Sequence, residues 1–334
     1  MEAILLVGGL GTRLHPLTLT TAKPMLPLGN IPITEHQLLR AAKSGIGRVV
    51  LSTSYLSDSF REYFQDGSRW GVELMYAIED EPLGTAGAIR NASRFLTTDA
   101  PIFIFNGDVI SHHDLQQQLA LHLESKADAT LHLLPVDDVR AYGKVTLDEN
   151  SRITEFLEKP QSTSKLPGDI NAGCYIFNPS VLEAIPLNRP VSIEREIFPT
   201  LVAEKKALLG YSEVAYWLDL GTPARYLKAN LDLLEGGTSL IGEATIDTSA
   251  TIMNSVIGFN VTVGANVSIS NSLILDNVVI RENSHISHTI LGNNVLVSAN
   301  SHLERVVAGD NLTLSGDTFP QSETIGVVST DEFR

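Results

Sequence analysis

The first two thirds of the chain alternate short apolar runs with segments of helical periodicity. The apolar runs have the length of buried strands and lie at Ala3–Val7, Arg48–Ser52, Glu73–Ala77, Ile102–Phe105 and Ala129–Leu133. The helical segments between them are Glu35–Lys43, Asp58–Phe64, Ala86–Phe95 and Asp114–Glu124. This alternation predicts βαβ units, and therefore a Rossmann-like α/β domain whose mostly parallel sheet is covered by helices.

Two polar segments follow strands of this predicted sheet. A glycine-rich loop follows Ala3–Val7, and the corner Asn106-Gly107-Asp108 follows Ile102–Phe105. Ligands of open α/β sheets bind beyond the carboxyl ends of the strands. The sequence therefore predicts that both segments lie on the ligand-binding rim.

The last third of the chain has a different period. Aliphatic residues recur with spacings of six, six and five, which gives a repeat of 17 residues, at Leu240, Ile246, Ile252, Ile257, Val263, Ile269, Ile274, Ile280, Ile286, Leu291, Val297, Leu303, Ala308 and Leu314. Two ladders of asparagines keep the same repeat, at Asn260, Asn277, Asn294 and Asn311 and at Asn266, Asn283 and Asn300. A three-sided coil explains both patterns, with one inward aliphatic residue per side and asparagines at corners that need positive φ.

The coil pattern resembles the hexapeptide repeat of left-handed parallel β-helices, with each coil shortened by one residue. It predicts a catalytic domain over residues 1–228, a linker over 229–239 that contains Gly236-Gly237, a β-helix over 240–316 and a C-terminal tail over 317–334. The flat faces of such a helix suit symmetric packing, so we expect a homo-oligomer that assembles through it.

Composition narrows the classes of partner. With 43% hydrophobic and 19% charged residues, the chain has the composition of a soluble globular protein. A net charge of −15 without a basic run argues against nucleic acid as a partner. The single cysteine, Cys174, excludes an internal disulfide and fits a reducing compartment. The apolar run in MEAILLVGG is too short for a signal peptide or a membrane span, so we expect a cytoplasmic protein with no membrane partner.

The loop LVGGLGTRLHPLTLTTAKPM carries the first candidate chemistry. Glycines in a strand-to-helix turn let backbone N–H groups approach phosphate oxygens. Arg13 adds a fork of donors suited to phosphate, and Lys23 adds a mobile point charge. The loop matches neither the dinucleotide-binding pattern nor the P-loop. From the glycines alone, a plain tight turn with solvated charges explains it equally well.

Other predicted loops carry further candidate site residues, most of them carboxylates. Asp108 and Asp219 follow separate strand ends, and two carboxylates beside a phosphate loop suggest Mg²⁺. Glu158 and Lys159 precede Pro160, where Glu158 can accept hydrogen bonds from sugar hydroxyls and Lys159 can meet a phosphate. Each feature taken alone is more typical of a turn-forming residue or of an exposed ion pair than of a site.

Taken together, these residues resemble the sugar-1-phosphate nucleotidylyltransferase family. The signature stretch is Gly8-Gly9-x-Gly11-Thr12-Arg13-Leu14-x-Pro16-Leu17-Thr18, followed by Lys23-Pro24. The resemblance covers the whole chain, with the catalytic domain first and the β-helix second. Five further stretches bring it nearest to the mannose-1-phosphate guanylyltransferase branch: Glu81–Gly87, Phe156–Pro160, Ile170–Gly173, Ser192–Pro199 and Trp217–Thr222. Thymidylyl- and uridylyltransferases more often place a glutamine-led segment at the base pocket, where this chain has Glu79-Asp80-Glu81-Pro82.

The resemblance implies a role for each of the candidate residues. It implies transfer of a nucleoside monophosphate from a nucleoside triphosphate to a sugar 1-phosphate, with Mg²⁺ as cofactor. The implied donor is GTP, and the implied acceptor is mannose 1-phosphate. Arg13 and Lys23 are the implied catalytic residues. The implied nucleotide contacts are Gly8, Gly9, Gly11, Thr12, Arg13 and Gly84; the sugar-phosphate contacts are Gly143, Glu158, Lys159 and Asn171; and the metal ligands are Asp108 and Asp219. No chemistry is assigned to His15, Cys174, His285 or His302.

Three other functions stay open at this point. The chain could be a thymidylyl- or uridylyltransferase that acts on glucose 1-phosphate or a related sugar phosphate. It could be a non-catalytic regulatory homologue, although all the implied cations and carboxylates are present. An additional acyltransferase site on the β-helix is disfavoured by its length of about four and a half coils, since such sites usually form on longer stacks.

Overall fold

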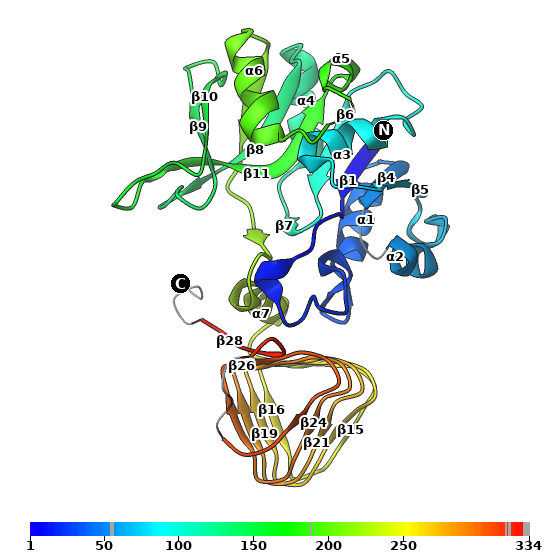
Figure 1. Cartoon of the computed structure of the whole chain (residues 1–334), viewed down its shortest axis with the longest axis vertical. Coiled ribbons are helices and arrows are strands. Elements are labelled where there is room, and N and C mark those ends of the chain that lie inside the picture. Colours follow the sequence, from blue (N-terminus) through cyan, green and yellow to red (C-terminus); the bar gives the residue numbers. More distant parts are fainter. Residues whose placement is uncertain (54–56, 188, 318, 320–321, 330–334) are drawn as a thin grey trace. The chain divides into compact units, whose positions relative to one another are not determined.

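A computed structural model describes residues 1–53, 57–187, 189–317, 319 and 322–329. The chain forms two compact units, one of Met1–Gly9 with His36–Trp217 and the other of Leu10–Glu35 with Leu218–Arg334 (Figure 1). The segment Leu10–Glu35, which sequence analysis assigned to the catalytic domain, thus belongs to the second unit. The domain boundary at residue 228 stays a prediction. Residues 318, 320–321 and 330–334 of the predicted tail lie outside the described residues.

A mixed sheet forms the centre of the first unit. Among the described residues its nine strands are β1 (Glu2–Leu6), β4 (Arg48–Thr53), β5 (Glu73–Ile78), β6 (Ile102–Asn106), β8 (Ala129–Val136), β9 (Gly143–Leu147), β10 (Ile153–Glu158), β11 (Gly168–Phe177) and β12 (Leu208–Ser212). The main order is β10-β9-β11-β6-β1-β4-β5, and β8 pairs with both β11 and β12. The five strands predicted from apolar runs are all present.

Part of this sheet is parallel and part is antiparallel. Strand β1 runs parallel to β4 and β6, β4 runs parallel to β5, and β8 runs parallel to β12. Strand β11 runs antiparallel to β6, β8 and β9, and β10 runs antiparallel to β9. The apolar runs reveal strands but not the direction of their neighbours, so the sequence did not predict this second region.

Helices cover the sheet where the sequence places them. The helices are α1 (Ile33–Lys43), which continues from the second unit's segment, α2 (Ser57–Phe64), α3 (Gly84–Ser93), α4 (Leu115–Glu124), α5 (Pro179–Ala184) and α6 (Phe198–Ala203), with the shorter turns η3 (Ser68–Trp70) and η4 (Ile193–Ile197) and the short strand β7 (Val109–Ser111). Helix α3 packs on β1 and β4, α4 on β8 and α5 on β11. No described helix is long and apolar enough to cross a membrane.

Three parallel sheets form the β-helix of the second unit (Figure 1). The first sheet contains β14 (Leu240–Ile241), β17 (Val256–Ile257), β20 (Leu273–Ile274), β23 (Ile290–Leu291), β26 (Val306–Ala308) and β28 (Ile325–Val327), of which β28 is antiparallel to β26. The second contains β15 (Ala244–Ile246), β18 (Val261–Val263), β21 (Val279–Ile280), β24 (Leu296–Val297) and β27 (Thr313–Leu314), and the third contains β16 (Thr251–Met253), β19 (Ser268–Ser270), β22 (His285–Ser287) and β25 (His302–Glu304). The predicted coils of 17 residues are therefore confirmed.

The predicted aliphatic ladder forms the core of these coils. From Ile257 to Leu314 its members are at most 2% exposed. In the first coil the ladder is less covered, with Leu240 39% exposed and Ile252 partly buried. That coil has a neighbouring coil on one side only, which explains the difference.

The asparagine ladders occupy two corners of the coil. All seven predicted asparagines have φ between 55° and 61°. Their side chains bond to the equivalent residue of the next coil, as in Asn266 Nδ2 to Asn283 Oδ1 at 3.1 Å and Asn294 Nδ2 to Asn311 Oδ1 at 3.0 Å. A third corner of positive φ, at Asn254, Asn271, His288 and Arg305, keeps the same spacing. The sequence alone does not reveal this corner, because its residue types vary.

The segment Leu10–Glu35 is attached to the rest of the second unit by several hydrogen bonds. This segment holds η1 (Thr12–Leu14), η2 (Lys23–Met25), β2 (Pro27–Leu28) and β3 (Ile31–Pro32), and the chain later returns through β13 (Trp217–Asp219) and α7 (Pro223–Asp232). Gly29 N donates to Asn230 Oδ1 at 2.9 Å, and Asn30 Nδ2 donates to Ile257 O at 2.9 Å. Thr20 Oγ1 donates to Asp310 Oδ2 at 2.6 Å. The loop residues from Leu10 onward are thereby fixed to α7 and to the β-helix.

Candidate functional site

The glycine loop starts directly after β1 and brings Gly11 against Lys23. Gly9 and Gly11 have φ of 118° and 61°. A Cβ on Gly11 would lie 3.1 Å from Lys23 Cβ and 3.2 Å from Thr18 Cγ2, so both the conformation and the space favour glycine. Thr18 Oγ1 donates to Gly11 O at 2.8 Å and closes the loop. The structure thus joins two predicted site residues that are twelve positions apart.

The two predicted catalytic cations have different surroundings. Lys23 opens η2 and is 7% exposed, whereas Arg13 in η1 is exposed. A Cβ on Gly221 would lie 3.0 Å from Arg13 Nη1 and 2.9 Å from Asp219 Oδ1. Gly221 therefore lets the Arg13 guanidinium and the Asp219 carboxylate occupy the same small space.

The Asp219 carboxylate is held by a second arginine. Asp219 Oδ2 lies 3.1 Å from Arg225 Nη1. Arg225 is in the first turn of α7, where Thr222 caps the helix by accepting from Arg225 N. In the sequence, no motif spacing distinguishes Arg225 from an ordinary helical arginine. Its contact orients the predicted metal ligand.

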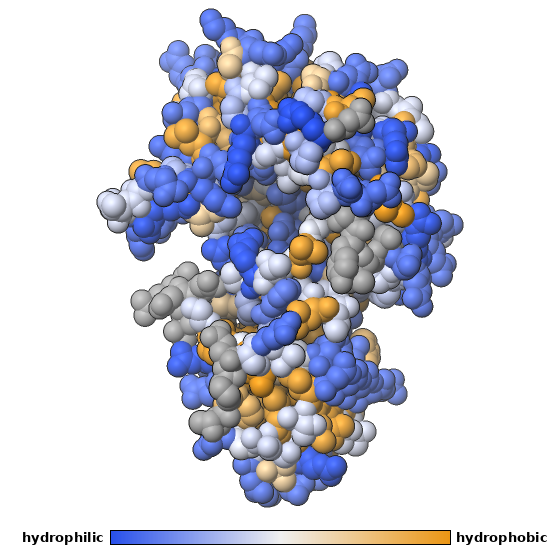
Figure 2. Space-filling view, viewed as in Figure 1, coloured by the Kyte–Doolittle hydropathy of each residue, from blue (hydrophilic) through white to orange (hydrophobic). Residues whose placement is uncertain are grey.

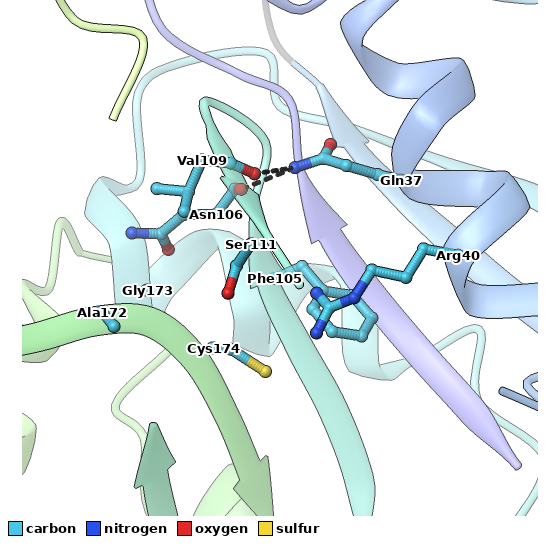
Figure 3. A pocket seen from close by; sticks show the side chains of 9 residues that line it. All are labelled: Gln37, Arg40, Phe105, Asn106, Val109, Ser111, Ala172, Gly173 and Cys174. Atoms are coloured by element: carbon cyan, nitrogen blue, oxygen red, sulfur yellow. Dashed lines mark hydrogen bonds between the residues drawn. The ribbon is translucent and has the colours of Figure 1, made fainter. Parts of the chain in front are cut away.

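In the first unit, Gln37 fixes the turn that carries Asp108 (Figure 3). Its Nε2 donates to Asn106 O and to Val109 O, each at 2.9 Å. Gly107 N donates to Leu6 O at 2.9 Å. The turn between β6 and β7 is therefore held on both sides of Asp108, which is partly buried. Gln37 has no sequence pattern that would have identified it.

A bulge in β11 presents Asn171 next to this turn. The register of β11 against β8 shifts between Asn171 and Tyr175. Asn171 Nδ2 donates to Tyr175 OH at 2.9 Å, and Trp217 Nε1 donates to Ala172 O at 2.9 Å. A Cβ on Gly173 would lie 2.9 Å from Asn106 Nδ2. The bulge with Asn171 and the turn with Asp108 are thus direct neighbours.

A small cavity lies between the bulge and the turn (Figure 3). Its volume is about 20 Å³, enough for about one water molecule. Gln37, Arg40, Ser111 and Cys174 contribute polar atoms to its lining. Burial raises the pKa of the Cys174 thiol to about 12. A buried neutral thiol is a poor nucleophile, so burial makes Cys174 unsuited to covalent catalysis.

The hairpin of β9 and β10 brings three predicted sugar-phosphate residues together. Gly143 and Glu158 are direct partners across the hairpin. Lys159 Nζ lies 3.6 Å from Glu158 Oε1. Burial and, second, the charge of Glu194 raise the pKa of the Glu158 carboxyl. The rings of Tyr142 and Trp217 meet edge to face at 5.7 Å beside Gly143.

Gly84 starts α3 after a loop that a buried carboxylate holds. Glu79 is 9% exposed, and its Oε2 accepts from Leu83 N at 3.0 Å. Burial raises the pKa of Glu79, an effect that the bond from Leu83 partly offsets. A Cβ on Gly84 would lie 2.6 Å from Val191 O, and its φ is 69°. Glu79 thus positions the predicted base-pocket residue, a function for it that the sequence did not indicate.

The two predicted metal ligands supply donors of the kind that Mg²⁺ prefers. Asp108 and Asp219 offer two carboxylates, which is the donor set that Mg²⁺ takes when phosphate oxygens complete its shell. A carboxylate has about four lone-pair directions, and the bond from Arg225 uses one of those of Asp219. The carboxylates of Asp108 and Asp219 therefore have the donor chemistry that a magnesium ion needs.

The rings of His285 and His302, to which the sequence assigned no chemistry, stack on successive coils with their centres 5.1 Å apart.

Two family profiles match the chain. The profile described as nucleotidyl transferase matches residues 2–236. The profile described as the EIF2B subunit epsilon LbH domain, a left-handed β-helix, matches residues 230–318. Both fold predictions are therefore confirmed, including the hand of the coil.

Similar proteins of known sequence carry the name mannose-1-phosphate guanylyltransferase. The protein from Mycobacterium tuberculosis is 46% identical over 238 residues, which are 71% of this chain and 65% of the relative. The chain thus spans less than two thirds of that relative. The catalytic subunit beta from Drosophila pseudoobscura pseudoobscura is 38% identical over 264 residues, which are 75% of this chain and 70% of the relative.

A solved structure shares the fold of a large part of the chain. HddC from Yersinia pseudotuberculosis is similar with a TM-score of 0.61 and 28% sequence identity, over 70% of this chain and 99% of that one. The same protein has been solved in complex with GMP-PN, with a TM-score of 0.60 to this chain.

Proposed function

Because this chain belongs to the nucleotidyl transferase family, we propose that it transfers GMP from GTP to mannose 1-phosphate and releases pyrophosphate. The identity of 46% with a mannose-1-phosphate guanylyltransferase carries the choice of substrates. The contact of the glycine loop with Lys23, in a chain that also retains Arg13, Asp108 and Asp219, supports a catalytic rather than a regulatory role.

The reaction needs no general base. The second pKa of a phosphate monoester is near ~6, so the phosphate of a sugar 1-phosphate is a dianion at neutral pH. One of its oxygens forms a bond to the α-phosphorus of GTP, while the bond from that phosphorus to the oxygen that bridges to the β-phosphorus breaks. The bond electrons leave with pyrophosphate, and no proton moves in the step.

The main barrier is that one anion attacks another. In this proposal Lys23 offsets the charge between the α-phosphate and the sugar phosphate, and Arg13 stabilises the pyrophosphate as negative charge develops on it. Backbone N–H groups of Gly8, Gly9, Gly11 and Thr12 bind the triphosphate, and Gly84 lines the base pocket. Holding the two substrates in line supplies much of the remaining rate acceleration.

The hairpin of β9 and β10 supplies the sugar-phosphate contacts in this proposal. Glu158 accepts hydrogen bonds from sugar hydroxyls, Lys159 binds the phosphate, and Gly143 also contacts the sugar phosphate. Asn171 offers a further polar contact from the bulge of β11. The pairing of Gly143 with Glu158 supports this grouping.

We propose that Asp108 and Asp219 are the ligands of a divalent cation, and that this cation is Mg²⁺. When bound, such an ion neutralises phosphate charge and polarises the phosphoryl oxygens. Arg225 keeps the Asp219 carboxylate oriented, and Gln37 keeps the turn of Asp108 in place.

We also propose that the chain is a homo-oligomer that assembles through its β-helix. Apolar side chains on and next to the first coil support this, because Leu240, Ile241, Met253 and Phe259 are 39%, 44%, 57% and 44% exposed. Figure 2 also shows apolar residues on the face of the β-helix that it presents, and exposed apolar surface often marks an interface. Mass measurement in solution distinguishes an oligomer from a monomer.

Pyrophosphate release over a matrix of nucleoside triphosphates and sugar 1-phosphates tests the proposed function. The expected result is the highest kcat/KM for GTP with mannose 1-phosphate. A preference for dTTP or UTP with glucose 1-phosphate would overturn the assignment of GTP and mannose 1-phosphate. It would leave intact the reaction class, which is nucleotidyl transfer to a sugar 1-phosphate. Release with no pair of substrates would favour a regulatory homologue.

A further inference from the structure

A second pocket of the first unit lies apart from the residues assigned above to the phosphates, the sugar and the metal. It has a volume of about 430 Å³, which is within the range of small-molecule sites. Arg90 of helix α3 and Arg94, which directly follows that helix, line it, and the segment after α5 contributes Leu187 and Arg189. Leu83 adds an apolar contact. Its lining includes no acidic side chain.

Two of the three arginines in this arginine pocket have no carboxylate partner among the described residues. The Nη1 atom of Arg90 reaches only Ser93 Oγ, at 3.5 Å. Its Nε is buried and has no hydrogen-bond partner in the described part of the chain. Arg94 is exposed, with its guanidinium 5.0 Å from the ring centre of its neighbour Phe95. Only Arg189 is paired, with Glu196 Oε2 at 2.7 Å.

This concentration of positive charge is unusual for the chain. The protein has 24 basic and 39 acidic residues, so an acidic partner for each arginine would be expected from composition alone. Guanidinium groups repel one another unless an anion lies between them. Their planar donor forks match phosphate oxygens, and a phosphate here would satisfy donors that have no acceptor.

We propose that the arginine pocket binds a small phosphorylated metabolite, with its phosphate on Arg90 and Arg94 and its organic part against Leu187. Leu187 is 61% exposed, so an organic group placed on it would remove apolar surface from water. Inorganic phosphate provides only the first of these contacts. An organic phosphate should therefore bind more tightly than phosphate itself.

The walls of the arginine pocket meet beside Gly84. Val191 N donates to Leu83 O at 2.8 Å, and Ala86 N donates to Val191 O at 2.9 Å. These bonds join the start of α3 to the segment that carries Leu187 and Arg189. A ligand that contacts both walls should change the position of Gly84, and thereby the Michaelis constant for the nucleotide. This second effect rests on the proposed function, whereas binding does not.

Titration calorimetry on the full chain tests the binding, with inorganic phosphate and glycerol 3-phosphate as probes. The wild type should bind both, and glycerol 3-phosphate more tightly. Arg94→Gln should weaken binding about tenfold, and Arg90→Gln with Arg94→Gln should abolish it. Arg69→Gln is the matched control, because Arg69 also lies over the ring of its neighbour, Trp70, at 5.1 Å.

Two comparisons make the result decisive. Binding should persist in Arg13→Ala, because the assigned triphosphate loop is not part of the arginine pocket. Unchanged binding in the double variant, or loss of binding in Arg13→Ala, would overturn the proposal. Since Arg94 is exposed, its single variant should unfold at the wild-type temperature, and its binding loss is then not a folding defect.

The kinetic effect is read separately. Glycerol 3-phosphate should shift the KM for GTP in the wild type and leave it unchanged in the double variant. An equal shift in both proteins would contradict the coupling through Val191. If the chain forms no nucleotide-sugar at all, the calorimetric result still decides whether the arginine pocket binds phosphate.

Discussion

Lys23 and Arg13 differ in how their side chains are held, and the difference fits two roles. Lys23 is buried next to Gly11, so its position is fixed before a substrate arrives. Arg13 is exposed and reaches the space beside Gly221. A fixed cation suits the reacting phosphorus, whereas an exposed guanidinium is accessible to a departing pyrophosphate. Both assignments stay proposals.

Removal of either cation should lower turnover by about 10²–10³-fold, because each stabilises charge that develops in the transition state. Arg13→Ala tests the exposed cation, and Lys23→Met removes the charge of the buried one while keeping its apolar stem. Initial rates of pyrophosphate release measure the effect. Arg281→Ala and Lys43→Ala, which change exposed cations elsewhere, should leave the rate unaltered. Full turnover in either site variant would remove the role assigned to that residue.

Glu79 makes the stability of the first unit depend on pH. Burial raises its folded-state pKa above the ordinary value of 4.5, so the native state holds its proton to higher pH than the unfolded state does. Glu79 therefore destabilises the protein as pH rises from about 4.5 through the folded pKa. In Glu79→Gln this loss of stability with rising pH should be absent. Unfolding temperatures of both proteins, measured at a series of pH values, show whether it is. Glu81→Gln is the exposed control; the same pH profile in Glu79→Gln and wild type would contradict the assignment.

At the scale of residues, the sequence predicted the groups that resemble a known family but not the groups that hold them. Gly143 and Glu158 were predicted separately, and the hairpin makes them partners. Gln37 acts through two hydrogen bonds to backbone carbonyls that lie 69 and 72 residues away, and Glu79 acts through one hydrogen bond from the backbone N–H of Leu83. No periodicity or spacing records such contacts, so only the structure identifies these residues.

At the scale of elements, the turn between β6 and β7 depends on one side chain. Gln37→Leu removes the side-chain N–H groups that donate to Asn106 O and Val109 O. A buried carbonyl left without its donor lowers the free energy of unfolding by about 1–3 kcal/mol. We expect lower stability and a loss of kcat/KM, since Asp108 is in this turn. Manganese binding in the presence of GTP, followed by electron paramagnetic resonance, should weaken as well.

Gln116→Leu is the matched control for this turn. Gln116 also donates to a backbone carbonyl, that of Ser44 at 2.6 Å, but it lies in none of the assigned groups. The control should keep normal manganese binding and kcat/KM. Weakening of both properties to the same extent in the two variants would show that Gln37 has no special relation to Asp108.

The β-helix offers a matched pair of core positions. Ile286 is fully buried in β22, whereas Ile252 lies in the first coil and is only partly buried. Ile286→Ala should cost about 2–5 kcal/mol, and Ile252→Ala should cost less because the site is already open. Urea unfolding followed by circular dichroism measures both. Equal losses would contradict the one-sided cover of the first coil.

Periodicity explains why the β-helix was predicted in more detail than the sheet. One aliphatic position per side fixes the coil, and every later member of the ladder is buried. The third corner escaped notice because His288 and Arg305 replace asparagine there. In the sheet, apolar runs identified β1, β4, β5, β6 and β8, but the pairing direction of β11 depends on contacts between distant segments.

At the scale of the whole molecule, the division of the chain into compact units was not predictable from composition. The segment Leu10–Glu35 carries the catalytic signature, yet its hydrogen bonds lead to Asn230, Ile257 and Asp310. Such contacts join segments more than 200 residues apart. Hydrophobic periodicity describes local elements and contains no information on these pairings.

One measurement tests the central claim most directly, namely the fate of ¹⁸O in the reaction of GTP with mannose 1-phosphate labelled at its non-bridging phosphate oxygens. Attack by the sugar phosphate on the α-phosphorus predicts that all label appears in GDP-mannose and none in pyrophosphate, as measured by mass spectrometry. Label in pyrophosphate, or GMP formed in place of GDP-mannose, would contradict the proposed transfer.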